Sequence, residues 1–258
     1  MKKLFTLITI TLAIIIYILF YSFYFKDGKT KPLVIGMMNG YAPFMTINKY
    51  GEMEGFDVDI CKEIEKKINR EIIIKDLGSL ASLFIALEQE TVDAILSGLD
   101  VTEKRKKDYD FVLYENDVTR FNTYCCITTK SGPQNENDLK NNSYIIGIEP
   151  ALSWEATLNK YILLKKTYIN SISDMIIQLQ QNKIDCFVIE PTQCKRIKKV
   201  IPDLNYFSVE MDPSIKIDGI GIFIKKNNTA VKNILQDAIN SLEEDKKIEN
   251  ITKKWNIG

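Results

Sequence analysis

Two separate parts of this chain follow the same local plan. Residues 87–96 and 179–188 each run from a leucine through a polar turn and an aliphatic residue to an aspartate and an apolar strand. Residues 34–36 and 145–147, Val-Ile-Gly and Ile-Ile-Gly, match in the same order. Short apolar strands alternate with amphipathic helical patterns around both pairs, as in mostly parallel sheets covered by helices. The sequence therefore predicts two lobes of similar α/β design.

The segments that follow the predicted strands are the first places to look for a binding site, because ligands of parallel α/β sheets bind at the carboxyl ends of the strands. The apolar runs that we predict as strands are 33–37, 92–96, 144–148 and 184–189. The residues expected to cap the following helices are Ser153, Ser173 and Thr229. The strand ends that direct attention to a site are Met37, Leu96 and Ile189.

The charge balance and the residue types exclude several classes of function. The 34 basic residues balance 34 acidic ones, so no net charge draws the chain toward nucleic acid. The chain contains no histidine, which removes the commonest general base and the commonest metal ligand. No Cys-x-x-Cys pair suggests a metal site either. We therefore expect no cofactor, no metal and no nucleic-acid partner.

The N-terminal segment has the pattern of an export signal. Lys2 and Lys3 precede an uncharged run over residues 4–25, long enough as a helix to cross a bilayer. The aromatic residues 21–25 do not fit the small-residue cleavage site of a removed signal. We expect residues 1–31 to form an uncleaved anchor helix and linker, which tether an extracytoplasmic body to the inner membrane.

Five cysteines in an exported protein raise the question of a disulfide. Cys125 and Cys126 are adjacent on a predicted strand, so their side chains point to opposite faces. Cys61, Cys186 and Cys194 lie in apolar or helical patterns. Their spacing favours buried free thiols and leaves room for one bridge.

The segment after residue 96 has features suited to an anion. Gly98 permits close backbone approach, and Thr102 with Glu103 opens a helical turn. Free backbone N–H groups there, with the Arg105 guanidinium, would suit a carboxylate. The alternative is that Arg105 is one solvated residue of the basic run 104–107, and spacing alone does not separate the two.

Four motifs in register resemble family 3 of the extracytoplasmic solute-binding proteins, which bind polar amino acids for ABC transporters. The stretch 96–111 looks like the family signature, and Gly55-Phe56-Asp57-Val58-Asp59 looks like its Gly-Phe-Asp-x-Asp motif. Residues 36–44 resemble its first strand and binding loop, and residues 184–191 its second-lobe strand and acidic loop. The likeness covers about residues 33–258, and is greatest to arginine-binding members from chlamydiae.

The resemblance implies a two-lobed α/β fold of the type II periplasmic-binding-protein class, joined by two hinge strands. The first lobe would comprise 32–121 with 218–258, and the second 122–217. The chain crosses between them near 121–126 and 212–219. Such a protein is expected to be a monomer that closes on an amino acid and delivers it to ABC transporter permease subunits.

The same resemblance assigns a role to each candidate site residue. Arg105 would pair with the α-carboxylate of the ligand, helped by backbone amides near Asp100 and by Ser153. Gly98 would offer its carbonyl to the α-ammonium, which Glu190 would bind by a salt bridge. The two residues expected to wall the side-chain pocket are Tyr41 and Phe44. A purely structural explanation of Glu190 is an acid that opens the helix starting at Pro191.

Three departures from the family pattern leave the ligand open. Asp100 stands where Ser or Thr is usual, which with Glu190 favours a cationic ligand such as arginine. Leu80 falls near a position where an aromatic ring often stacks on the ligand, and Met38 replaces a polar or acidic residue. These two changes favour a less polar ligand.

Two other functions fit the same fold. Relatives of this fold act as dehydratases on cyclohexadienyl substrates, and Glu190 is the right type of residue for a proton donor. Against an enzyme, the sequence shows no nucleophile–base pair and no metal set. Related domains also form the outer parts of receptors, so the chain could sense a ligand for a membrane partner.

Overall fold

The computed structural model describes residues 14–17, 30–118 and 122–257. The chain divides into two compact units, Met1–Pro32 and Leu33–Gly258, and the second unit holds every element discussed below. The predicted anchor, residues 1–31, lies almost entirely outside the described residues. Within the described residues, no helix combines the length and the apolarity that crossing a membrane requires.

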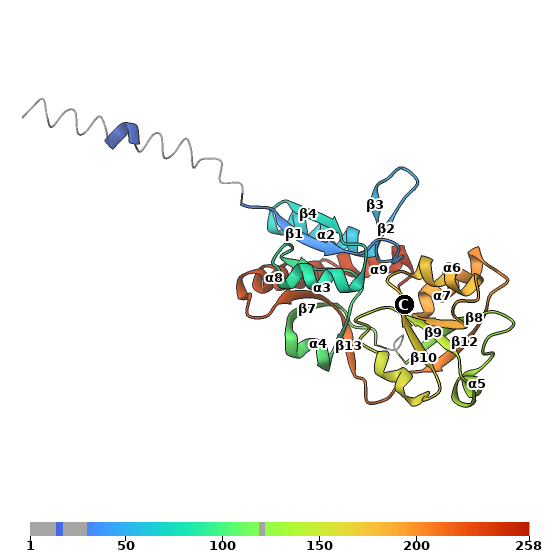
Figure 1. Ribbon diagram of the computed structural model, residues 1–258. Coiled ribbons are helices and arrows are strands. Elements are labelled where there is room, and N and C mark those ends of the chain that lie inside the picture. Colours follow the sequence, from blue (N-terminus) through green and yellow to red (C-terminus); the bar gives the residue numbers. More distant parts are fainter. Residues whose placement is uncertain (1–13, 18–29, 119–121, 258) are drawn as a thin grey trace, which may run out of the picture. The chain divides into compact units, whose positions relative to one another are not determined.

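The first of the two large sheets has the strand order β4-β1-β5-β13-β6, with β7 also pairing on β13. Figure 1 labels β1, β4, β7 and β13 of this sheet. Its strands are β1 (Leu33–Met37), β4 (Ile72–Asp76), β5 (Ala94–Ile95), β6 (Asp100–Thr102), β7 (Tyr109–Glu115) and β13 (Ile217–Lys225). The helices that belong to this lobe are α2 (Phe56–Ile68), α3 (Leu80–Glu88), α4 (Glu103–Asp108), α8 (Thr229–Glu244) and α9 (Lys247–Trp255). Strands β4, β1 and β5 run parallel, and β13 runs antiparallel to its neighbours.

Helix α8 shows how sequence pattern fixes the packing of this lobe. Its residues Leu235, Ala238, Ile239 and Leu242 follow the i, i+3, i+4, i+7 spacing of one helix face, and all four are buried in the first core. Burying each Leu or Ile stabilises the fold by about 2 kcal/mol. The helix packs against α2 and so closes one side of the sheet.

The second sheet has the strand order β10-β9-β11-β8-β12. Its strands are β8 (Thr123–Thr128), β9 (Ile145–Ile148), β10 (Lys165–Tyr168), β11 (Cys186–Ile189) and β12 (Asn205–Glu210). Its helices are α5 (Glu136–Asn141), the 3-10 helix η2 (Glu155–Lys160), α6 (Ile172–Gln180) and α7 (Pro191–Val200). Strand β9 runs parallel to β10 and β11, which brings the carboxyl ends of these strands to one edge. A separate hairpin consists of β2 (Thr46–Ile47) and β3 (Met53–Glu54).

The chain passes between the two sheets twice, once from β7 to β8 and once from β12 to β13. Met211, on the second passage, packs against hydrophobic clusters of both lobes. The fold is therefore two-lobed, as predicted. The lobe limits given above, 32–121 with 218–258 and 122–217, stay a prediction.

The cysteines divide between the two faces of the second sheet. Cys125 packs in the cluster with Met175, and Cys126 packs in the cluster with Trp154, so the two side chains do point to opposite faces. Cys125 forms a disulfide with Cys194 of α7, whereas Cys61, Cys126 and Cys186 are buried free thiols. The bridge that the spacing left open therefore forms in this structure.

Two predicted helix caps are wrong by one or two residues. Helix α6 is capped by Ser171, whose hydroxyl accepts from the Asp174 amide at 3.1 Å, and not by Ser173. Helix α8 is capped by Asn228, because Thr229 is already its first helical residue. Both errors have one cause. A neighbouring Ser, Thr or Asn fits the cap pattern equally well, and the backbone conformation determines which of these residues is the N-cap.

Candidate functional site

The Arg105 side chain lies in the first lobe at the start of a short helix. Thr102 caps α4, and its hydroxyl accepts from the Arg105 amide at 3.3 Å, as the predicted helical turn requires. Arg105 is 6% exposed, so it is not a solvated residue of the basic run. Its Nη1 donates to the Asp100 carbonyl at 2.9 Å and also pairs with the Asp100 carboxylate.

Two aromatic rings hold the guanidinium of Arg105. The guanidinium carbon lies 5.1 Å from the centre of the Phe84 ring and 5.7 Å from that of Phe223. At these distances a cation is attracted to the electron-rich ring faces. The rings come from α3 and β13, so the orientation of Arg105 is set by the packing of the first lobe.

Arg105 and Asp100 also contact the second lobe. Arg105 Nη2 donates to the Ala151 carbonyl at 3.2 Å, and the Ser153 hydroxyl donates to the Asp100 carboxylate. Ala151 has a φ of 66°, a left-handed conformation that a residue with a side chain adopts at a cost. Ser153 caps no helix, contrary to prediction, because η2 is preceded by Trp154 and the Ser153 hydroxyl is used by Asp100.

Gly98, Phe44 and Tyr41 form one packed group in the first lobe. Gly98 has a φ of 62°, and a Cβ added there would lie 2.6 Å from the Phe44 ring. The Phe44 ring is 2% exposed and belongs to the first core, and it stacks on Tyr41 with ring centres 5.5 Å apart. Tyr41 lines a cavity between the lobes, and Phe44 supports it from the core.

Two acids meet in this cavity from neighbouring parallel strands. Glu149 follows β9 and Glu190 follows β11, and both line the cavity with Tyr41. Glu149 is 7% exposed, and burial, followed by the nearby Glu190 charge, raises the pKa of its carboxyl to about 7. The remaining lining residues are apolar: Leu152, Trp154, Ile172, Met175, Val188 and Ile189.

Glu190 is held by more than its position at the start of α7. It occupies the N-cap ahead of Pro191, but its side chain makes no capping hydrogen bond. The pKa of Tyr41 is raised by burial and then by Glu190, to which the Tyr41 hydroxyl is hydrogen-bonded. Since Tyr41 belongs to the first lobe, the carboxylate of Glu190 serves a contact between the lobes and not a helix cap.

Trp154, which lines the cavity, stacks on a second aromatic ring. Tyr124 of β8 and Trp154 stack with their centres 4.0 Å apart. The Tyr124 hydroxyl is buried and has no hydrogen-bond partner among the described residues. Burial, and then the charges of Asp100 and Glu190, raise the pKa of Tyr124. A buried hydroxyl without a partner loses stability of about 1–3 kcal/mol, which a polar ligand could restore.

The space between the lobes is divided in two. The cavity at Glu149 and Glu190 measures about 20 Å³, which is room for one water molecule. A second hollow of about 180 Å³ lies beside Arg105 and Ser153. Leu152 lines both spaces and packs against hydrophobic clusters of both lobes. An amino acid that touched both Arg105 and Glu190 would therefore require the lobes to move apart and Leu152 to shift.

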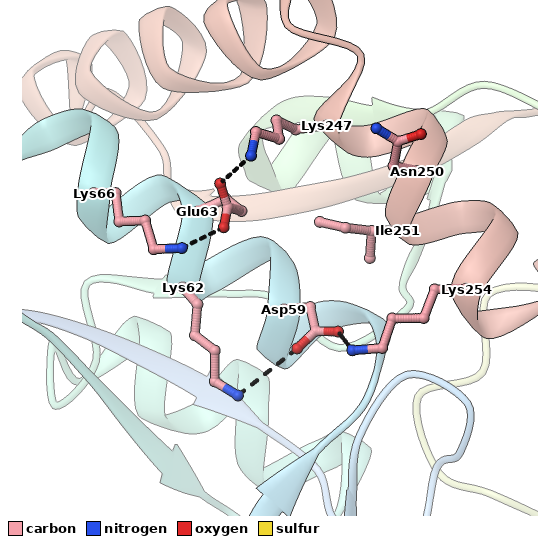
Figure 2. Close-up of a pocket in the computed structure, with 8 residues that line it drawn as sticks. All are labelled: Asp59, Lys62, Glu63, Lys66, Lys247, Asn250, Ile251 and Lys254. Atoms are coloured by element: carbon pink, nitrogen blue, oxygen red, sulfur yellow. Dashed lines mark hydrogen bonds and ion pairs between the residues drawn. The ribbon is translucent and has the colours of Figure 1, made fainter.

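A hollow of about 340 Å³ between α2 and α9 has a different character (Figure 2). Glu63 pairs with Lys66 at 2.5 Å and with Lys247 at 3.5 Å. Asp59 pairs with Lys254 at 2.6 Å and with Lys62 at 3.7 Å. Each acid in the wall is thus matched by lysines, and exposed pairs of this kind contribute little energy. The four lysines outnumber the two acids, so this wall is net positive and presents no acid without a lysine partner.

Sequence reasoning missed several residues that the structure brings to the site. Glu149 follows a predicted strand, and the rule applied to Met37, Leu96 and Ile189 would have found it. Gln193, whose side chain donates to the Ala42 carbonyl of the other lobe, carried no signal in the sequence. The aromatic residues that also escaped notice are Phe84, Tyr124, Trp154 and Phe223.

The chain is similar to known solute-binding proteins. Residues 33–123 match the model of the bacterial extracellular solute-binding proteins, family 3. The chain is 29% identical over 238 residues to an arginine-binding extracellular protein of Bacillus subtilis, with 90% of this chain and 89% of the relative covered. It is 21% identical over 232 residues to a probable ABC transporter arginine-binding protein of Chlamydia trachomatis, covering 90% and 88%.

A solved structure shows the same fold. A periplasmic binding protein of Salmonella typhimurium with high arginine specificity superposes with a TM-score of 0.76 at 22% identity, covering 88% of this chain and 99% of that one. The fold is that of the two-lobed periplasmic binding proteins. The predicted resemblance to family 3 solute-binding proteins, including an arginine-binding one from a chlamydia, is confirmed.

Proposed function

We propose that this protein is an extracytoplasmic receptor that binds an amino acid with a cationic side chain and delivers it to an ABC importer. The observation that carries the proposal is the charge arrangement of the cleft. Buried Arg105 lies on the first lobe, and the acids Glu149 and Glu190 lie on the second. A zwitterion needs one fixed cation and one fixed anion, and here they come from opposite lobes.

The ligand would bind by replacing contacts that the protein makes with itself. Arg105 and Ser153 now hold the Asp100 carboxylate, and the same donors suit the α-carboxylate of an amino acid. Glu190 would bind the α-ammonium, with the Gly98 carbonyl as a second acceptor. Closing the lobes removes water from these pairs and strengthens them, so the bound ligand favours the closed state.

The relatives support the choice of ligand class. Both curated relatives described above are named as arginine-binding proteins, and each aligns over about nine-tenths of this chain. The aligned region includes both lobes. We therefore propose arginine as the first ligand to test, and lysine and ornithine next.

The setting of the receptor is part of the proposal. We propose that residues 4–25 tether a monomeric receptor to the inner membrane, on the extracytoplasmic side, close to its permease subunits. Carbonate-resistant association of the full chain with membranes, lost when residues 1–31 are deleted, would support the tether. Release of the full chain by carbonate would contradict it.

Catalysis is not part of the proposed function. In this account Glu190 holds an ammonium group through a salt bridge, and Arg105 is arranged to bind and not to activate a bond. Turnover of prephenate by the purified protein would contradict this and favour the dehydratase alternative.

Thermal unfolding of the full chain in mild detergent, with each of the twenty amino acids plus ornithine and citrulline, tests the function. A ligand that binds only the folded state stabilises it by about 4 kcal/mol at a thousandfold excess over Kd. We expect the largest shift with arginine or another cationic amino acid, and no shift in Arg105→Ala or Glu190→Ala. The absence of any shift with all twenty-two compounds would contradict the proposal.

A further inference from the structure

Glu149 is a buried acid without a partner. Its side chain is 7% exposed, and it makes no hydrogen bond or ion pair with any residue in the described parts of the chain. It faces the cavity between the lobes, together with Glu190, Tyr41 and Trp154. The other acids of the cleft differ in this respect, since Asp100 is paired with Arg105 and Glu190 with the Tyr41 hydroxyl.

An unpaired carboxylate in such a place is unfavourable. Moving a charge into an apolar surrounding costs several kcal/mol unless it is paired, and the nearby Glu190 adds repulsion between like charges. Leu152 and Met175, which line the same cavity, have no side-chain donor that could compensate the charge. A cation brought into the cavity would remove both costs.

The charges of the cleft also indicate how many cations a ligand should carry. With Arg105 bound to the α-carboxylate of the ligand, as proposed above, the residues that line the cavity include two acids, Glu149 and Glu190, and no lysine or arginine. An amino acid with an uncharged side chain brings one ammonium group. A basic amino acid brings a second cation on a stem of methylene groups, which would lie against the apolar walls.

We infer that Glu149 is the specificity-determining residue of the site: its carboxylate binds the cationic end of the ligand's side chain, so the receptor selects guanidinium or ammonium side chains over neutral ones of the same shape. This inference rests on the proposed function and adds a residue and a selection rule to it. It predicts that the selectivity for charge comes from the second lobe.

Arginine and citrulline are the probes that separate charge from shape, because citrulline has a neutral ureido group where arginine has the guanidinium. Titration calorimetry at pH 8 on the full chain in mild detergent gives the ratio of the two dissociation constants. We expect a strong preference for arginine in the unsubstituted protein, and a fall in that preference of about 30-fold or more in Glu149→Gln, as expected when one partner of a buried charge pair is lost. Citrulline affinity should change little.

Glu210→Gln is the matched control, since Glu210 is an exposed acid of the same lobe on β12. It should leave the ratio unchanged. An arginine-to-citrulline ratio in Glu149→Gln within threefold of the unsubstituted protein would overturn the role of Glu149 and leave the receptor function intact. Failure of every amino acid to bind the unsubstituted protein would overturn both.

Glu149→Asp covers the case in which Glu149→Gln does not fold. The aspartate keeps the charge but withdraws it by one methylene group, so the arginine preference should fall to an intermediate value. A preference equal to that of the unsubstituted protein would overturn the inference.

Discussion

Removing the charge of Glu149 should change how the stability of the free protein depends on pH. Burial raises the pKa of this carboxyl from 4.5 to about 7 in the folded protein. The folded state therefore holds the proton more tightly than the unfolded state. Its contribution to stability is complete below pH 4.5 and is lost as the pH rises through about 7.

The size of the effect follows from the pKa values. Each pKa unit corresponds to about 1.4 kcal/mol, so the rise of the Glu149 pKa from 4.5 to about 7 corresponds to about 3 kcal/mol. Glu149 is 7% exposed, so solvent screens little of this free energy. The glutamine of Glu149→Gln cannot ionise, so the variant does not lose this stability as the pH rises. Between pH 4.5 and pH 8, the free energy of unfolding of the variant should therefore gain about 3 kcal/mol on that of the unsubstituted protein.

Urea unfolding of both proteins at several pH values, without ligand, measures this difference. Other groups titrate at lower pH, among them Glu63, whose pKa is lowered by its hydrogen bond to Lys66. These groups are present in both proteins, so the difference between the two curves reports Glu149 together with its interactions with Glu190 and Tyr41. Parallel pH profiles for the two proteins would show that Glu149 does not carry an unpaired buried charge.

Three further substitutions test other parts of the account. Asp100→Asn should raise arginine affinity about tenfold in calorimetry, because Arg105 no longer has to exchange an internal carboxylate for that of the ligand; equal or weaker binding would count against this exchange. Gly98→Ala should destabilise the protein by about 2 kcal/mol or more in urea, because of its φ of 62° and the adjacent Phe44 ring; unchanged stability would disprove the close packing. Replacing Cys125 and Cys194 together by serine should cost about 4 kcal/mol, because the bridge joins residues 69 apart in sequence; a urea midpoint equal to that of the unsubstituted protein would show that the bridge does not form.

The sequence was informative where one pattern determines one structure. The apolar run 33–37 becomes β1 with the predicted limits, since no competing turn residue interrupts it. Thr102 and Glu103 open α4 as expected, and Arg105 is buried beside them. Adjacent Cys125 and Cys126 point to opposite faces because side chains alternate along any strand.

The remaining features depend on contacts between distant residues, which periodicity does not encode. The pairing of Asp100 with Arg105 and Ser153 needs both lobes in place, so the family resemblance could assign roles to these residues but could not predict the internal ion pair. Phe44 was expected in the pocket wall, yet the close approach of Gly98 places its ring in the core. Glu149 follows a strand like the other site residues, and only burial distinguishes it from a surface acid.

A crystal structure of the protein grown with L-arginine would show whether the cleft binds arginine as proposed. We expect arginine between the lobes, with its α-carboxylate on Arg105 in place of the Asp100 side chain, its α-ammonium on Glu190 and its guanidinium within hydrogen-bonding distance of Glu149. Arginine bound in the reverse orientation, or only in the hollow between α2 and α9, would contradict the proposal.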